Sequence, residues 1–282
     1  MKIDAHQHFW KYNHKEYSWI SDGIEDLKKD FLPSDLWPEL KQLKFDGSIA
    51  VQARQTPEES RWLLGLTAKF DFIKGVVGWV DLCSSEANYQ LAEFASHPKF
   101  VGVRHVLQDE PDDRFMLRDD FLKGISLLRK YSLVYDLLII PRHLPYAISF
   151  VKEFPDQRFV LDHLAKPLIK ERILSPWKEG IQELALQPNV FCKLSGMVTE
   201  ASWAGWRRED FELYLDVIFS SFGPSRLMIG SDWPVCTLAS GYKETMQIVV
   251  DYVATKDQTE REMIMGGNAI RIYKLEKDNN GL

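Results

Sequence analysis

The sequence predicts a single-domain α/β protein, a (β/α)₈ barrel of the TIM type, on three observations. Eight short and nearly continuously apolar segments alternate with helix-compatible segments, as expected of parallel strands that are covered on both faces. The chain has 282 residues, of which 45% are hydrophobic, and this suffices for one barrel of about 250 residues. No glycine-rich loop follows the first expected strand, where His6 and His8 lie instead, so a dinucleotide-binding sheet is disfavoured.

The expected elements follow in order along the chain. Segments rich in β-branched and aromatic residues are the expected strands, namely residues 2–8, 47–53, 73–82, 100–107, 133–140, 158–164, 189–195 and 226–232. The helices expected between them are residues 57–70, 85–96, 119–131, 144–154, 177–187, 208–222 and 242–255. The first of these helices starts after Thr56, a good N-cap, with Pro57 at the first helical position. The barrel is expected to occupy residues 1–275, and residues 276–282 to form a C-terminal tail.

Two long connections, residues 9–36 and 196–208, interrupt the alternation of strand and helix. Both are rich in aromatic residues. In a barrel, the loops that follow the strands surround the mouth of the active site. Trp10 in the first connection and Trp203 in the second are therefore candidate substrate-binding residues.

The composition argues against several function classes. The net charge is -6, from 41 acidic and 35 basic residues, and a nucleic-acid partner would need a concentrated basic surface. No apolar stretch approaches the roughly 18–20 residues of a membrane span, and the amino-terminal residues do not resemble a signal peptide. Cys83, Cys192 and Cys236 match neither a disulfide framework nor a cysteine zinc site, so a reducing cytoplasm is expected. The expected partner is a small molecule, and homo-oligomer formation is left open.

Both ends of the chain contribute polar residues at the end of an apolar strand. Asp232 ends the last expected strand, two residues before Pro234, and a buried carboxylate there is costly without a partner or a task. His6 and His8 end the first expected strand and share one of its faces. Two imidazoles and a carboxylate suit one divalent ion such as zinc, so these three residues are candidate metal ligands. Asp232 is also a candidate general base. The alternatives are hydrogen-bonded structural histidines and a carboxylate that loop amides satisfy.

Two further histidines lie on expected strands. His163 ends the sixth strand and is a candidate catalytic residue that polarises a carbonyl group or ligates a metal. His105 follows Arg104 on the fourth strand, and strand alternation lets at most one of the two side chains point inward. His105 is a candidate catalytic residue and Arg104 a candidate substrate-binding residue. For all three, a structural role in the core is the alternative.

A lysine interrupts the apolar seventh strand. Lys193 is costly to bury unless it meets a carboxylate or an anionic oxygen, so a catalytic oxyanion role and an internal ion pair are both open. Gln52 and Trp79 also lie on expected strands. Both are candidate substrate-binding residues, with packing as the alternative.

Taken together, these motifs resemble the amidohydrolase superfamily, specifically its amidohydrolase-2 branch with sugar-acid lactonases of the L-fuconolactonase and L-rhamnonolactonase type. The resemblance begins with Asp4-Ala5-His6-Gln7-His8 and continues, in order, over nearly the whole chain. The further matching segments are residues 75–82, 102–105, 135–138, 161–167, 189–196 and 230–234. The joint match is specific for the family and much less specific for one substrate.

The resemblance implies a (β/α)₈ barrel that hydrolyses an aldonolactone to its sugar acid, with His6, His8, His163 and Asp232 in the active site. Members of the wider superfamily with two metal ions use a strand-four lysine or glutamate and a strand-five histidine. This chain offers Arg104 and His105 on strand four and no histidine on strand five. One divalent ion, or none, is therefore expected. A metal-dependent decarboxylase of the same branch and a non-catalytic sugar-acid binding barrel are the competing interpretations.

Overall fold

Eight parallel strands form a closed barrel in the computed structural model, which describes residues 1–275. The strands are β1 (Ile3–Gln7), β2 (Gly47–Val51), β3 (Ile73–Gly78), β4 (Phe100–His105), β5 (Val134–Leu137), β6 (Phe159–Leu161), β7 (Val190–Leu194) and β8 (Leu227–Ile229). They pair in sequence order from β1 to β8. Backbone hydrogen bonds just beyond the last strand close the ring: the amide of His8 donates to Trp233 O (2.7 Å), and that of Asp232 donates to His6 O (2.8 Å). The first and last strands are therefore neighbours, as the barrel requires.

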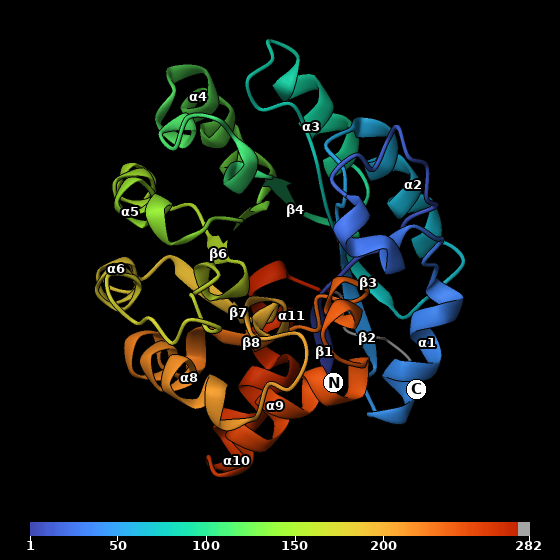
Figure 1. The fold of residues 1–282 in the computed structure, drawn as a ribbon. Coiled ribbons are helices and arrows are strands. Elements are labelled where there is room, and N and C mark those ends of the chain that lie inside the picture. The colour runs from blue at the N-terminus through green and yellow to red at the C-terminus, as the bar shows by residue number, and fades with distance from the viewer. Residues whose placement is uncertain (276–282) are drawn as a thin grey trace.

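Helices surround these strands in a ring (Figure 1). They are α1 (Pro33–Gln42), α2 (Pro57–Thr67), α3 (Ala87–Ala95), α4 (Asp119–Leu128), α5 (Leu144–Glu153), α6 (Trp177–Leu184), α7 (Met197–Glu200), α8 (Glu209–Phe222), α9 (Tyr242–Ala254), α10 (Gln258–Glu262) and α11 (Asn268–Tyr273). Helix α2 starts as expected, because the Thr56 side chain accepts a hydrogen bond from the amide of Glu59 and Pro57 occupies the first turn.

The inside of the barrel is divided into an apolar and a polar part. Side chains from all eight strands form one apolar cluster with Ala269, Ile272 and Tyr273 of α11. Residues of all eight strands can meet one another only inside a closed barrel. Because α11 packs against this apolar cluster, it covers the amino-terminal end of the barrel. At the carboxyl ends of the strands, buried polar and charged side chains replace the apolar ones. The fold thus places its polar groups where barrel enzymes hold their active sites.

The predicted fold class is confirmed, but several element boundaries differ. The last strand ends at Ile229 and the sixth at Leu161, so Asp232 and His163 lie beyond the strands that were expected to contain them. Helix α1 lies partly in the connection predicted for residues 9–36 and was not expected, because Pro38 interrupts its pattern. Helices α10 and α11 were also not expected, and the predicted loop 196–208 starts with the short helix α7. The predicted tail, residues 276–282, lies outside the described residues.

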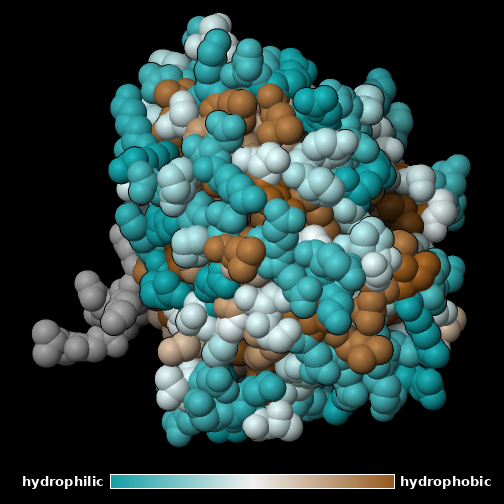
Figure 2. Space-filling view, turned by 90° about the vertical axis from the view of Figure 1, so that its left-hand side faces the viewer, coloured by the Kyte–Doolittle hydropathy of each residue, from teal (hydrophilic) through white to brown (hydrophobic). Residues whose placement is uncertain are grey.

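The outer surface is mixed rather than apolar. Figure 2 shows small, separated hydrophobic patches among hydrophilic residues on the face that it draws. Within residues 1–275, no helix combines the length and the apolar character that crossing a membrane would require.

Candidate active site

His163 and Asp232 both lie in turns with left-handed backbone conformation. Asp232 follows β8 with a φ of 58°, and His163 follows β6 with a φ of 52°. The positive φ values continue through Lys166, although such conformations cost free energy in residues other than glycine. Backbone strain of this kind is typical of functional sites, where the surrounding structure maintains it. Gly196 is required beside His163, because a Cβ there would lie 2.5 Å from the imidazole Nδ1.

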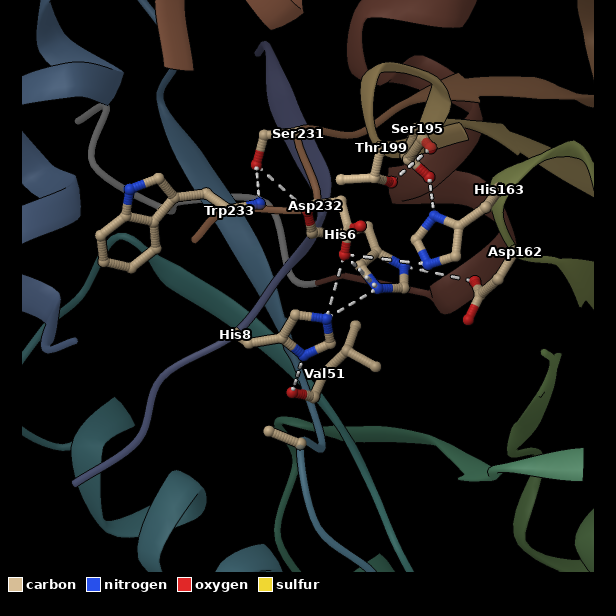
Figure 3. Close-up of polar contacts among 12 residues, drawn as sticks. His6, His8, Val51, Asp162, His163, Ser195, Thr199, Ser231, Asp232 and Trp233 are labelled. Carbon is tan, nitrogen blue, oxygen red and sulfur yellow. Dashed lines mark hydrogen bonds and ion pairs between the residues drawn. The ribbon is translucent and has the colours of Figure 1, made fainter. Parts of the chain in front are cut away.

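Four side chains converge at the carboxyl ends of β1, β6 and β8 (Figure 3). We call His6, His8, His163 and Asp232 the cavity cluster. His8 Nε2 lies 3.2 Å from Asp232 Oδ1 and 3.2 Å from His6 Nε2. The same carboxylate oxygen lies 3.7 Å from His6 Nε2 and 3.8 Å from His163 Nε2. The sequence pattern predicts that these four residues meet, and the structure brings them together.

The hydrogen bonds of His8 and His6 fix which ring nitrogens face Asp232 as acceptors. His8 Nδ1 lies 2.9 Å from Val51 O, and a carbonyl oxygen only accepts, so this nitrogen carries a proton. His6 has a donor at each ring nitrogen, Arg104 Nη1 at 3.3 Å from Nε2 and Lys193 Nζ at 3.2 Å from Nδ1. Asp162 Oδ1, an acceptor 3.3 Å from Nδ1, favours the proton on Nδ1 and leaves Nε2 as the acceptor. With neutral imidazoles, two nitrogen lone pairs and one carboxylate oxygen face one another. Such a group of acceptors requires either an extra proton on an imidazole or a cation.

The donor set fits a divalent metal ion. His6, His8 and Asp232 each offer one ligand atom, and these atoms lie within 4.8 Å of one another. Ligands at about 2.0–2.1 Å from a tetrahedral zinc ion are roughly 3.3 Å apart, close to the 3.2 Å between the two histidine nitrogens. His6 Nδ1 also lies 3.3 Å from Asp162 Oδ1, which is the carboxylate contact that zinc-bound histidines usually make. Arg104 Nη1 and a metal ion would compete for the same lone pair of His6. With an ion bound, Arg104 would therefore keep only its 3.0 Å hydrogen bond to Asp162 at this nitrogen.

Burial and neighbouring charges set the protonation of the cavity cluster. Burial lowers the pKa of His163 to about 4, although Asp232 and Asp162 oppose the shift, and burial also lowers the pKa of His6. Both imidazoles are therefore neutral at neutral pH. Burial by itself would raise the pKa of Asp232, but the neighbouring imidazoles of His163, His8 and His6 outweigh that effect. The Asp232 carboxyl consequently has a pKa below its ordinary value and is ionised.

A second group of charges lies deeper in the barrel. We call Lys193, Asp136, Asp162 and Tyr273 the buried ion cluster. Lys193 Nζ forms ion pairs with Asp136 and, at 3.1 Å, with Asp162 Oδ1, and Tyr273 donates to Asp136 Oδ1 (2.6 Å). Burial by itself raises the pKa of Asp162, but the charge of Lys193 and the neighbouring His6 imidazole outweigh it and hold that pKa well below its ordinary value. The side chain of Lys193 is fully buried and is not among the residues that line the cavity.

A cavity of about 380 Å³ opens above the cavity cluster, within the usual size range of ligand pockets. Its walls include His8, His163 and Asp232, together with the predicted residues Gln52 and Arg104. Arg104 Nη2 donates to Gln52 O and to Gln52 Oε1, at 2.5 and 3.0 Å. The two predicted polar side chains thus support each other at the cavity wall.

Four predicted site residues lie elsewhere. On β4, the side chain of Arg104 points into the barrel, so that of its neighbour His105 points outward. His105 pairs with Glu110 (2.6 Å) and stacks on Phe115. The indole nitrogen of Trp79 donates to His105 Nδ1 (3.3 Å). Trp10 is fully buried and donates to Lys29 O, 2.9 Å away. Trp203 is 43% exposed and donates to Thr199 O. None of the four is among the cavity-lining residues within the described chain.

Several supporting residues were not singled out from the sequence. Asp4 is fully buried and accepts from the amide of Ser231 (2.9 Å), the hydroxyl of Ser231 (2.7 Å) and the hydroxyl of Tyr242 (3.2 Å). It thereby fixes the turn that carries Asp232. Its position two residues before His6 on an apolar strand was the available signal. Lys166 lines the cavity. Its only sequence signal was its position close to His163.

The sequence model of the amidohydrolase family matches residues 3–275. The chain belongs to this family. Among curated relatives, the L-fucono-1,5-lactonase of Burkholderia multivorans is 41% identical over 286 residues, covering 98% of this chain and 96% of the relative. The L-fucono-1,5-lactonase of *Burkholderia ambifaria* is 36% identical over 283 residues, with 98% and 96% covered. These relatives confirm the predicted family and the predicted enzyme class, a hydrolase.

A solved amidohydrolase structure from *Burkholderia multivorans* with bound zinc superposes on this chain with a TM-score of 0.93. It is 41% identical in sequence, and the superposition covers 98% of this chain and 100% of that one. The zinc in that structure agrees with a metal site in this family, and the His/Asp group described above is a candidate for it.

Proposed function

We propose that this amidohydrolase opens a sugar-derived lactone, an aldonolactone such as L-fucono- or L-rhamnonolactone, to the sugar acid. The observation that carries the proposal is the ionised Asp232 at the floor of a polar cavity, with three histidines within 4 Å of one carboxylate oxygen. The names of the two curated relatives support the choice of a lactone. Cys83, Cys192 and Cys236 are free, in keeping with a cytoplasmic enzyme.

In this proposal Asp232 acts as the general base. Its carboxylate takes a proton from a water molecule, and that water attacks the lactone carbonyl carbon. The tetrahedral intermediate collapses with cleavage of the bond to the ring oxygen, and Asp232 returns the proton to that oxygen. The single product is the open sugar acid, which carries a hydroxyl group at the former ring oxygen, so atoms and charges balance. The low pKa of Asp232 makes it a weak base, which suits an ester substrate better than an amide.

His163 polarises the carbonyl group. Its Nδ1 lies 2.9 Å from Ser195 Oγ. When the serine hydroxyl donates to Nδ1, the neutral imidazole carries its proton on Nε2, where it can donate to the developing oxyanion. A divalent ion held by His6, His8 and Asp232, zinc being the first candidate, would supply Lewis-acid polarisation and lower the pKa of a bound water. Lys193 has no contact with substrate in this proposal and instead holds Asp162 and His6, from which it lies 3.1 and 3.2 Å away.

Proton release on a panel of aldonolactones, corrected for spontaneous hydrolysis, tests the proposal. The expected result is catalytic turnover of at least one six-carbon aldonolactone. Release of carbon dioxide from hydroxybenzoic acids, with no lactone opened, would favour the decarboxylase interpretation instead. Saturable binding of a sugar acid without any turnover would favour the non-catalytic barrel.

A further inference from the structure

Three loops form one continuous wall of the cavity. Glu16 lies between β1 and α1, Arg54 and Gln55 lie between β2 and α2, and Val106 and Gln108 follow β4, and all five line the cavity. Arg54 Nη1 pairs with Glu16 Oε2 at 2.6 Å. Gln55 Oε1 accepts a hydrogen bond from the amide of Val106 at 2.7 Å. The wall is therefore held together by contacts between loops that are far apart in the sequence.

The buried carboxylate of Glu59 accepts hydrogen bonds from two of these loops. Glu59, in the first turn of α2, has no exposed surface. Its Oε2 accepts from the amides of Ala53 (3.0 Å) and Arg54 (2.9 Å), and its Oε1 accepts from the hydroxyl of Tyr17 (3.3 Å). The Arg54 guanidinium in turn lies 5.6 Å from the centre of the Tyr17 ring. Glu59 thus fixes the backbone of Arg54 and the aromatic ring beside its side chain.

Residues that line this wall carry buried polar atoms that have no hydrogen-bond partner among the described residues. They are Gln52 Nε2, Arg54 Nε and Gln108 Oε1. Arg104 donates to Gln52 Oε1 (3.0 Å), so the orientation of that amide is fixed and its Nε2 is the free end. Buried polar atoms without partners are costly. Two donors and one acceptor along one wall match hydroxyl groups, since each hydroxyl both donates and accepts.

We propose that Gln52, Arg54 and Gln108 form the subsite that reads the hydroxyl groups of the substrate, and that Glu59 is the positioning residue that holds Arg54 in it. The subsite lies on the wall of the cavity, and the carbonyl of the lactone lies at the floor beside Asp232 and His163. The proposal rests on the proposed function, because it assumes a polyhydroxylated lactone. It assigns the choice of sugar to Arg54 and Gln108, not to the aromatic residues Trp10 and Trp203.

Substrates that lack one hydroxyl group test the subsite directly. The variants are Gln108→Leu and Arg54→Met, and kcat/KM is measured on the lactone that the wild type opens and on each of its monodeoxy analogues. We expect Gln108→Leu to lower kcat/KM on the parent lactone about tenfold and Arg54→Met about 10- to 100-fold, as the loss of a neutral and of a charged hydrogen bond predicts. For each variant, the loss should shrink to within about twofold on the one analogue that lacks the hydroxyl it reads. Arg61→Met and Gln182→Leu, two exposed positions on α2 and α6 outside the cavity wall, are matched controls.

The positioning role of Glu59 has its own readout. Glu59→Leu should raise KM with little change in kcat. It should also reduce the difference in kcat/KM between the parent lactone and the deoxy analogue that Arg54 discriminates. Glu59→Gln keeps an oxygen for the two backbone amides and should restore most of that discrimination. Equal losses on every analogue for the Arg54 and Gln108 variants, with an active wild type, would overturn the subsite alone. If the wild type opens no lactone, the proposed function falls and the subsite falls with it.

Discussion

The cavity cluster and the buried ion cluster are both buried and both polar, and they adjoin where His6 Nδ1 lies 3.3 Å from Asp162 Oδ1. Their chemistry nevertheless differs. In the buried ion cluster, Lys193 and the adjoining Arg104 face the carboxylates of Asp136 and Asp162, so two positive charges meet two negative ones. In the cavity cluster, acceptor atoms of His6, His8 and Asp232 point at one another. A balanced cluster stabilises a fold, whereas a group of acceptors needs a proton, a cation or a substrate. We therefore expect the buried ion cluster to stabilise the fold and the cavity cluster to act on a ligand.

Removal of the central cation should show that the buried ion cluster is structural. Lys193→Met leaves two buried carboxylates without their shared partner, and loss of one member of a buried pair costs about 3–5 kcal/mol. We expect a melting temperature lower by roughly 10 °C, measured by calorimetry. The double variant Lys193→Met with Asp136→Asn should recover part of this loss. An unchanged melting temperature in the single variant would mean that the cluster does not stabilise the fold.

Metal addition should act on the cavity cluster alone. Zinc at about one hundred times its dissociation constant stabilises a protein that binds it by about 2.7 kcal/mol. We therefore expect zinc to raise the melting temperature of the wild type by about 5 °C or more, and a chelator to reverse the rise. His8→Ala should abolish the response. A rise of equal size in His8→Ala would place the zinc outside the cavity cluster.

The buried carboxyl of Glu59 should make stability depend on pH. Burial raises the pKa of Glu59 to about 7, although hydrogen bonds from Arg54 and Ala53 oppose the shift. Between about pH 4.5 and 7 the folded protein then binds more protons than the unfolded chain, so stability falls as the pH rises. Glu59→Gln lacks this titration, and we expect it to gain on the order of 2–3 kcal/mol relative to the wild type between pH 5 and 8. Denaturant unfolding at both pH values measures the difference.

A matched variant isolates that effect. Glu58→Gln changes the neighbouring side chain, which is 70% exposed on the same turn of α2. It should follow the pH dependence of the wild type. A Glu59→Gln variant with the same pH dependence as the wild type would contradict the buried titration.

The smallest effect is expected at a residue that the sequence placed in the site. Trp203 is 43% exposed and outside the cavity. Trp203→Ala should change kcat/KM by less than about twofold, because exposed positions away from the site rarely matter by more than 0.5 kcal/mol. A larger loss in steady-state assays would mean that the loop of Trp203 covers the substrate during turnover.

The sequence was most informative where a polar residue interrupts an apolar strand. His6, His8, His163 and Asp232 could be predicted because the carboxyl ends of barrel strands meet at one face, whichever helices connect them. The same reasoning identified Lys193 but left its role open, since only the closed barrel brings Asp136 and Asp162 against it.

The residues of the proposed subsite and two of the helical segments gave no comparable signal. Glu59 looks like an ordinary acidic residue in the first turn of a helix, and nothing local reveals that it faces Tyr17. Arg54 and Gln108 lie in loops, where side-chain periodicity ends. Helix α1 contains Pro38, and the π-helical turn Met263–Gly267 before α11 contains two glycines, so both segments lack a regular helical pattern.

We infer that Asp232 acts on the substrate, whereas the buried ion cluster stabilises the barrel. The most direct test measures kcat of Asp232→Asn on the lactone that the wild type opens, with the melting temperature of the same preparation as control. We predict that kcat falls about 10²–10⁴-fold, as expected for loss of a general base, while the variant stays folded. A folded Asp232→Asn enzyme with wild-type kcat would contradict the account.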